Sequence, residues 1–133
     1  CWLTKPSCAM SLRRVPFAFY RSGTSRGLFL EEGHVPARGP TRERLLCKLM
    51  GSGVPQQVSG FGGGTGPTNK VMIVGRHSQS GWVTMDFNQV VVDVPKVDFS
   101  HGDCGNMLAA VGPFALEKGL VEPEVHGQKA TVR

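Results

Sequence analysis

Residues 98–119 read DFSHGDCGNMLAAVGPFALEKG, a polar turn punctuated by glycines and followed by an apolar run. The apolar side chains recur at the i, i+3, i+4 and i+7 spacing of one helix face, at Met107, Leu108, Val111, Phe114 and Ala115. Because Ala109, Ala110 and Leu116 fill most of the remaining face, we expect a helix that is buried nearly all round. Gly119 should end this helix, and the other elements should pack around it.

Cys104 lies where this helix is predicted to begin. Unpaired backbone N–H groups and the positive end of the helix dipole favour a thiolate there over a thiol, and the thiolate is the reactive form. Asp103 would oppose this effect if its carboxylate pointed at the sulfur. Many free cysteines are buried packing residues, whereas the small or polar neighbours Gly105 and Asn106 favour a functional site. The residues alone leave both interpretations open.

The composition narrows the classes of partner. Hydrophobic residues make up 40% of the 133 residues without a long apolar run, so we expect neither a transmembrane helix nor a membrane partner. Lys and Arg number 15 against 10 Asp and Glu, a net charge of +5, and most of the surplus precedes residue 50. These charges are dispersed and rarely alternate with aromatic residues. A small polyanionic substrate is therefore expected rather than a nucleic acid.

The four cysteines are Cys1, Cys8, Cys47 and Cys104. They form no CxxC pair and no His/Cys ligand spacing, so we expect neither a metal site nor a disulfide framework. Free thiols indicate a reducing compartment, and we expect a cytoplasmic location. We assign residues 1–14 to a disordered leader and residues 15–133 to a single domain that ends within a strand.

Short strands and one further helix make up the rest of the chain. Strands are predicted at Val15–Tyr20, Leu28–Leu30, Lys70–Val74, 81–87, 89–94 and 130–133. The first two should form a hairpin around the polar turn 21–27, and segments 81–87 and 89–94 should pair with each other.

An amphipathic helix should start at the N-cap Thr41 and stop at Gly51, with Cys47 as an inert packing residue. Trp82 and Phe87 are expected in the core. These patterns predict an α+β fold, in which a curved sheet surrounds the apolar helix.

Lys70 follows the glycine-rich loop Gly60–Asn69 and opens an apolar strand. It is either a lysine that snorkels at a strand end or a partly desolvated lysine that is suited to proton transfer. The loop lacks the Gly-Lys-Ser/Thr ending of a P-loop, but its successive backbone N–H groups could hold a carboxylate. The turn around Arg21–Arg26 is either a solvated hairpin tip or a second anion site.

Three motifs resemble those of the PrpF-like family: Arg21-Ser-Gly-Thr-Ser-Arg-Gly27, Gly60-Phe-Gly-Gly-Gly-Thr-Gly-Pro-Thr-Asn-Lys70 and Asp103-Cys-Gly-Asn-Met107. The similarity extends from about Val15 to Arg133. The family includes 2-methylaconitate cis–trans isomerase and 4-oxalomesaconate tautomerase, and its fold is similar to that of diaminopimelate epimerase. The resemblance implies one of two related domains, each a curved, mostly antiparallel sheet around a central helix, with the active site between them.

The implied reaction is a 1,3-proton shift that moves a C=C bond in an aconitate-like tricarboxylic acid, with neither a cofactor nor a metal. By the same resemblance, Lys70 and Cys104 are the proton-transfer residues. The residues that would hold the substrate carboxylates are Ser22, Thr24, Ser25, Gly64, Thr65, Thr68, Gly105 and Asn106. Ser22 and Arg26 stand where the family usually has Gly and Lys.

Family members are much longer than this chain. The resemblance therefore implies that a C-terminal domain, or a second chain in a homodimer, completes the site. Two other functions stay open at this point. One is an epimerase or racemase of the same fold, which would use a pair of cysteines. The other is a truncated, non-catalytic fragment that binds anions or a partner.

Overall fold

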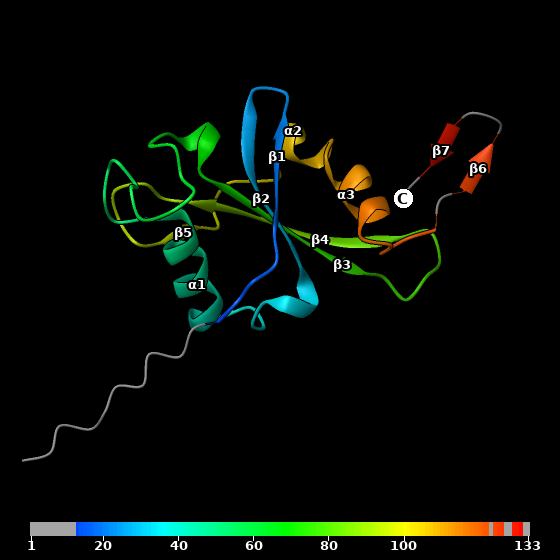
Figure 1. Ribbon diagram of the computed structural model, residues 1–133, viewed down its shortest axis with the longest axis horizontal. Coiled ribbons are helices and arrows are strands. Elements are labelled where there is room, and N and C mark those ends of the chain that lie inside the picture. The colour runs from blue at the N-terminus through cyan, green and yellow to red at the C-terminus, as the bar shows by residue number, and fades with distance from the viewer. Residues whose placement is uncertain (1–12, 123, 127–128, 132–133) are drawn as a thin grey trace, which may run out of the picture.

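The computed structural model describes residues 13–122, 124–126 and 129–131 (Figure 1). A five-stranded sheet has the order β1-β2-β3-β4-β5, with β1 (Ala18–Ser22), β2 (Ser25–Glu31), β3 (Lys70–Arg76), β4 (Val83–Val90) and β5 (Val97–Asp98). Neighbouring strands are antiparallel except β2 and β3, which are parallel. β6 (Glu124–His126) and β7 (Lys129–Thr131) pair as a separate hairpin.

The helices are α1 (Pro40–Met50), α2 (Gly105–Leu108) and α3 (Val111–Glu117), with two short 3-10 turns, η1 (Glu32–His34) and η2 (Gly66–Thr68). The α+β class is therefore as predicted. α1 connects β2 to its parallel neighbour β3, and it ends at Gly51 in the left-handed conformation, φ 70°, as predicted. It begins at Pro40, one residue before the expected N-cap Thr41.

Alternate side chains of the central strands enter two separate cores. On one face, Leu28, Leu30, Val71 and Ile73 pack with residues of α1. On the other face, Phe29, Met72 and Val74 pack with residues of α2 and α3. The helices thus cover opposite faces of one twisted sheet (Figure 1).

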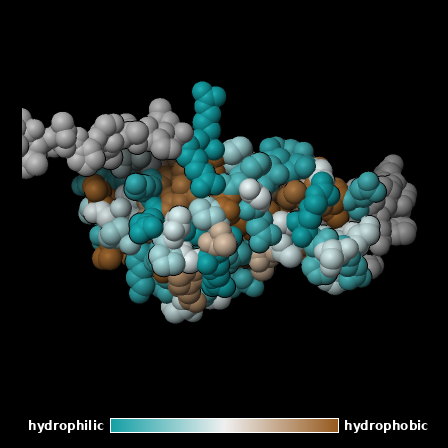
Figure 2. Space-filling view, turned by 90° about the horizontal axis from the view of Figure 1, so that it is seen from below, coloured by the Kyte–Doolittle hydropathy of each residue, from teal (hydrophilic) through white to brown (hydrophobic). Residues whose placement is uncertain are grey.

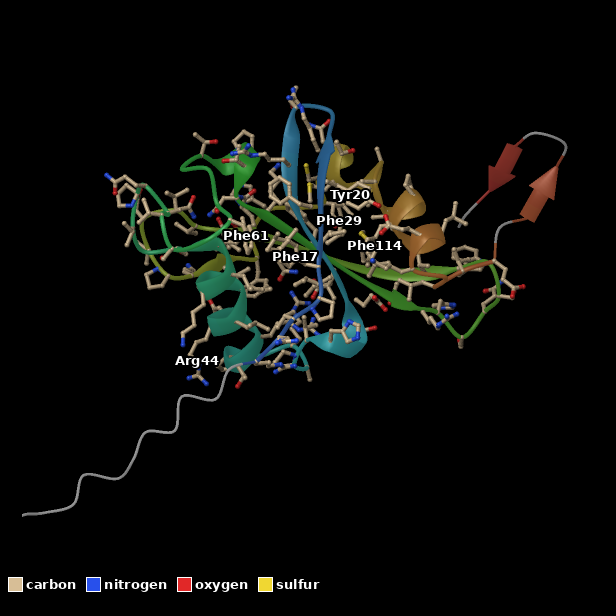
Figure 3. All side chains as sticks on the ribbon, viewed as in Figure 1. Phe17, Tyr20, Phe29, Arg44, Phe61 and Phe114 are labelled. Carbon is tan, nitrogen blue, oxygen red and sulfur yellow. The ribbon has the colours of Figure 1, made fainter. Side chains whose placement is uncertain are left out.

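An aromatic cluster fixes α3 against the first two strands (Figure 3). The ring centroid of Phe29 lies 5.1 Å from that of Tyr20 and 5.5 Å from that of Phe114. The Tyr20 hydroxyl also donates a hydrogen bond to Glu117 at the end of α3. This hydrogen bond is the main cause that raises the pKa of Tyr20.

The hairpin of β1 and β2 turns in two residues, Gly23 and Thr24. Gly23 has φ 58°, which glycine adopts without steric cost, and a Cβ at this position would collide with the side chain of Asn106. The predicted turn over 21–27 was too wide, because the strands remain paired as far as Ser22 and Ser25.

The segment 98–119 holds two short helices instead of one long one. Pro113 has no N–H to donate to the carbonyl of Ala109, and its ring would clash with that carbonyl in a continuous helix. The chain therefore breaks between α2 and α3, and Pro113 falls in the first turn of α3, where it is tolerated. Leu108 and Leu116 are 38% and 37% exposed, so the prediction of a helix buried nearly all round was wrong.

The pairing predicted for residues 81–94 was also wrong. One strand, β4, runs through Asn88 and pairs with β3, and the turn comes later, before Val97. Asn88 is buried inside the strand, where its side chain donates a hydrogen bond to the carbonyl of Asp86. Trp82 is 40% exposed, contrary to the expected core position. Phe87 is half-buried against the core that Phe29, Met72 and Val74 form with α2 and α3.

Cys47 packs in the α1-side core, as predicted. Burial raises the pKa of its thiol, and the nearby Glu43 carboxylate adds to the effect. The cysteine is therefore held as an unreactive neutral thiol.

Most of the predicted leader, residues 1–12, lies outside the described residues, as do the last two residues of the strand predicted at 130–133. In the described ranges, no helix is long and apolar enough to span a membrane. Figure 2 shows apolar residues scattered among polar ones on the face that is seen from below.

Candidate active site

Lys70 and Cys104 meet on the face of the sheet that α2 covers. Lys70 is the first residue of β3, and its side chain projects on the same side as Met72, towards α2. Cys104 is the N-cap of α2. The Lys70 Nζ donates a hydrogen bond to the Cys104 Sγ over 3.1 Å, so the two residues that the resemblance paired are in direct contact.

The hairpin tip supplies the polar groups around this pair. Ser25 is buried, and its Oγ lies 3.9 Å from the Cys104 Sγ. The Asn106 Nδ2 donates to the Thr24 Oγ1 over 2.8 Å and to the Ser25 Oγ over 3.4 Å. Ser22 is the buried cross-strand partner of Ser25. Asn106, two residues after the cysteine, thus connects α2 directly to the hairpin.

The surroundings of Cys104 favour its thiolate. Partial burial acts to raise the pKa of the thiol, but the backbone N–H of Met107, the Lys70 ammonium group and the Ser25 hydroxyl together lower it below its ordinary value. α2 has only four residues, so local hydrogen bonds account for the shift, and a long helix dipole does not. Lys70 Nζ also lies 5.7 Å from the centroid of the Phe87 ring, over its face.

The space in front of α2 is open. A Cβ added at Gly105 or Gly102 would have no neighbour within 4 Å. Cys104 itself is half-exposed. A small ligand can therefore approach the sulfur from this side.

A hollow of about 360 Å3 lies beside the hairpin tip. It is lined by Phe19, Arg21, Thr24, Ser25, Arg26 and Thr68. Three of the expected carboxylate-binding residues, Thr24, Ser25 and Thr68, thus line the hollow. Two more contact them: the Thr65 Oγ1 lies 3.0 Å from the Thr68 Oγ1, and Asn106 bonds to Thr24 and Ser25. The two arginines give the hollow a positive charge.

The glycine-rich loop does not present the expected row of free N–H groups. The N–H groups of Gly60, Phe61 and Gly62 donate to backbone carbonyls, and that of Gly64 donates to the side chain of Gln57. The loop therefore offers the N–H of Gly63 and the hydroxyls of Thr65 and Thr68, rather than a continuous row of N–H groups, to a ligand.

A larger hollow, of about 650 Å3, lies along α1 and contains none of the predicted site residues. It is lined by Pro40, Glu43, Arg44, Cys47, Lys48, Gly51, Ser52, Ser59, Pro95 and Lys96. The Lys70–Cys104 pair thus lies outside this hollow.

The sequence model of the PrpF protein family matches residues 12–132. The chain belongs to the PrpF protein family. Its similarity to two curated members is high. It is 46% identical over 114 residues to 4-oxalomesaconate tautomerase of Pseudomonas putida, covering 84% of this chain and 31% of that protein. It is 40% identical over 131 residues to 2-methyl-aconitate isomerase of Cupriavidus necator, covering 90% of this chain and 32% of that protein.

A solved isomerase structure has the same fold over this region. The crystal structure of methylitaconate-delta-isomerase aligns with a TM-score of 0.75 and 34% identity, covering 83% of this chain and 28% of that one. The chain thus spans about a third of the length of the curated relatives it matches.

Two features of this PrpF chain were not found from the sequence. Gln57, in a loop that reads as polar, is buried and hydrogen-bonds to three separate segments. Arg42 is buried on α1 and pairs with Asp86 on β4 over 2.9 Å. Both lie among turn or charged residues whose patterns predict exposure, so no sequence signal distinguishes them. His101, three residues before Cys104, pairs with Asp98 over 2.9 Å.

Proposed function

We propose that this chain carries the proton-transfer pair of a cofactor-independent isomerase, which catalyses a 1,3-proton shift in an aconitate-like tricarboxylic acid. The observation that carries the proposal is the 3.1 Å contact between the Lys70 Nζ and the Cys104 Sγ. The names of the relatives support it, because they are isomerases and a tautomerase.

The two side chains suit a reaction that removes a proton from one carbon and returns one to another. An allylic C–H next to a carboxylate is weakly acidic, and its removal leaves a dienolate that positive charge stabilises. The thiolate of Cys104 can accept the proton, and the Lys70 ammonium group can donate one or stabilise the anion. The lowered pKa of Cys104 raises the share of its thiolate, the basic form, at any given pH.

The carboxylates of the substrate need several donors around this pair. We assign that role to the hydroxyls and the amide of Ser22, Thr24, Ser25, Thr65, Thr68 and Asn106, with the backbone of Gly64 and Gly105 leaving room for the ligand. The N–H of Gly64 itself is already donated to Gln57. Arg21 and Arg26 add positive charge in the hollow that Thr24, Ser25 and Thr68 line, next to the Lys70–Cys104 pair rather than around it. The three carboxylates of the substrate and the two arginine side chains are opposite in charge.

We further propose that a second part completes the site, as in a two-domain epimerase-like architecture. The open space before Gly105 and the exposed leucines of α2 and α3 support a covering partner. The chain's share of its relatives, about a third, supports the same idea. The remaining domain or a second copy of the chain could supply this part.

The free thiols of Cys47 and Cys104 are consistent with a cytoplasmic setting.

Activity can be tested in a chimera, in which this chain replaces the matching segment of the Pseudomonas putida tautomerase. Lys70→Ala should lower the turnover rate for aconitate-type substrates by about 100-fold or more, because the proton-transfer group is lost. The same change at the exposed Lys48, which lies outside the site, is the matched control and should leave the rate unchanged. A Lys70→Ala chimera with the parent rate would refute the proposal.

A further inference from the structure

Gln57 has an unusual conformation for its residue type. In the part of the chain that the structure describes, it is the one non-glycine residue with a positive φ, 47°. It is also 1% exposed, although it lies in an irregular loop between α1 and the glycine-rich segment. A strained and buried polar residue persists only where its surroundings hold it in place.

The side-chain amide of Gln57 ties three segments together. Its Nε2 donates to the carbonyl of Met50, the last residue of α1, over 3.0 Å, and to the Asn69 Oδ1 over 2.7 Å. Its Oε1 accepts the N–H of Gly64 over 2.7 Å. Both amide hydrogens and the amide oxygen are therefore in use.

The glycine-rich segment is shaped around this amide. A Cβ at Gly62 would overlap the Gln57 side chain, and the backbone N–H of Gly60 donates to the Gln57 carbonyl over 3.0 Å. On its other side the segment meets the proposed binding site, since a Cβ at Gly63 would collide with the side chains of Arg26 and Thr68. The position of Gln57 thus determines how the segment lies against the hollow.

We propose that Gln57 is a positioning residue, which holds segment 60–64 so that Thr68 lines the carboxylate-binding hollow and the Thr65 hydroxyl stays hydrogen-bonded to it. Gln57 touches no ligand itself. The proposal rests on the proposed function only for what the hollow binds. Lys70 is anchored separately, by the pairing of β3 with β2 and β4. Loss of Gln57 should therefore loosen the loop and leave the Lys70–Cys104 pair intact.

An amide is the side chain that this position requires. A carboxylate of the same size could accept the Gly64 N–H, but it would face the Met50 carbonyl and the Asn69 Oδ1 with no hydrogen to donate. Protonation of that carboxylate would restore one of the two donations.

The test uses the 133-residue chain and hydrogen–deuterium exchange of single amides. In the unchanged chain, the Gly64 N–H should exchange more slowly than that of Gly63, for which the described residues provide no acceptor. Gln57→Leu should speed the exchange of Gly64 by about tenfold or more, because its hydrogen bond is lost. Gln56→Leu, the same change at the exposed neighbour, should leave the exchange unchanged.

Two further readouts separate positioning from a general role in stability. Gln57→Leu should weaken binding of citrate, the tricarboxylate probe, by about tenfold, and it should leave the pH profile of Cys104 alkylation unchanged. Unaltered exchange at Gly64 would overturn the proposal, and so would a displaced Cys104 profile. If citrate does not bind even the unchanged chain, that result counts against the proposed function, and the exchange of Gly64 still decides the role of Gln57.

Should Gln57→Leu fail to fold, Gln57→Glu decides the matter. An ionised carboxylate facing the Met50 carbonyl and the Asn69 Oδ1 should be repelled from its place, so the protection of the Gly64 N–H, corrected for intrinsic rate, should be low where it is ionised and should recover as the pH falls. Protection that is constant with pH would overturn the proposal.

Discussion

The charge of one sulfur atom depends on where Lys70 places its ammonium group. Cys104 is half-exposed, so water already stabilises its thiolate in part, and burial still acts against the charge. The Lys70 Nζ at 3.1 Å and the Met107 N–H provide opposite charge and a hydrogen bond, and these lower the pKa of the thiol. The pKa of the Cys104 thiol therefore depends on Lys70, and the reactivity of the cysteine reports on the lysine.

Lys70→Met should shift the alkylation of Cys104 to higher pH, because a raised pKa leaves less thiolate at any given pH. The rate of iodoacetamide reaction, followed at the Cys104 peptide by mass spectrometry across a pH series, measures the shift. Lys48→Met is the matched control and should leave the profile in place. A profile that is the same in all three proteins would show that Lys70 does not act on the sulfur.

At the scale of the elements, the sheet is held by a helix on each face, and the α1 side offers a simple test of packing. Leu46 is 1% exposed in the core beneath α1. Leu46→Ala should lower the free energy of unfolding by about 2–5 kcal/mol, because it removes buried methyl groups and leaves a cavity. Leu116→Ala, the same change at an exposed site on α3, should cost at most about 1 kcal/mol. Urea denaturation of the two variants measures the difference, and equal losses would contradict the packing described.

The elements also show what the sequence can and cannot predict. Lys70 as a strand start, Gly51 as a helix stop and the contact of Lys70 with Cys104 followed from local patterns and from the resemblance. The break between α2 and α3 was not predicted. Pro113 causes it, but the spacing of the apolar residues alone continues across the proline and indicates one helix. The burial of Gln57 depends on contacts between segments that are far apart in the chain, and no local pattern encodes these.

At the scale of the whole molecule, the site lies on an open surface. The chain spans about a third of the relatives it matches, and the hollow at the hairpin tip has no lid among the described residues. Water would compete for the carboxylate donors and would protonate a dienolate at such a surface. We therefore expect the 133-residue chain alone to bind a tricarboxylate weakly, and efficient turnover to need the completed site.

The central claim is that one group removes a proton and a different group returns one. The most direct measurement is a single turnover of an aconitate-type substrate in D2O by the chimera, with the product analysed by NMR. Because the returned proton comes from a group that exchanges with solvent, nearly every product molecule should carry deuterium at the carbon that gains hydrogen. Transfer of the substrate's own hydrogen to that carbon, with little deuterium in the product, would contradict a two-residue mechanism at Lys70 and Cys104.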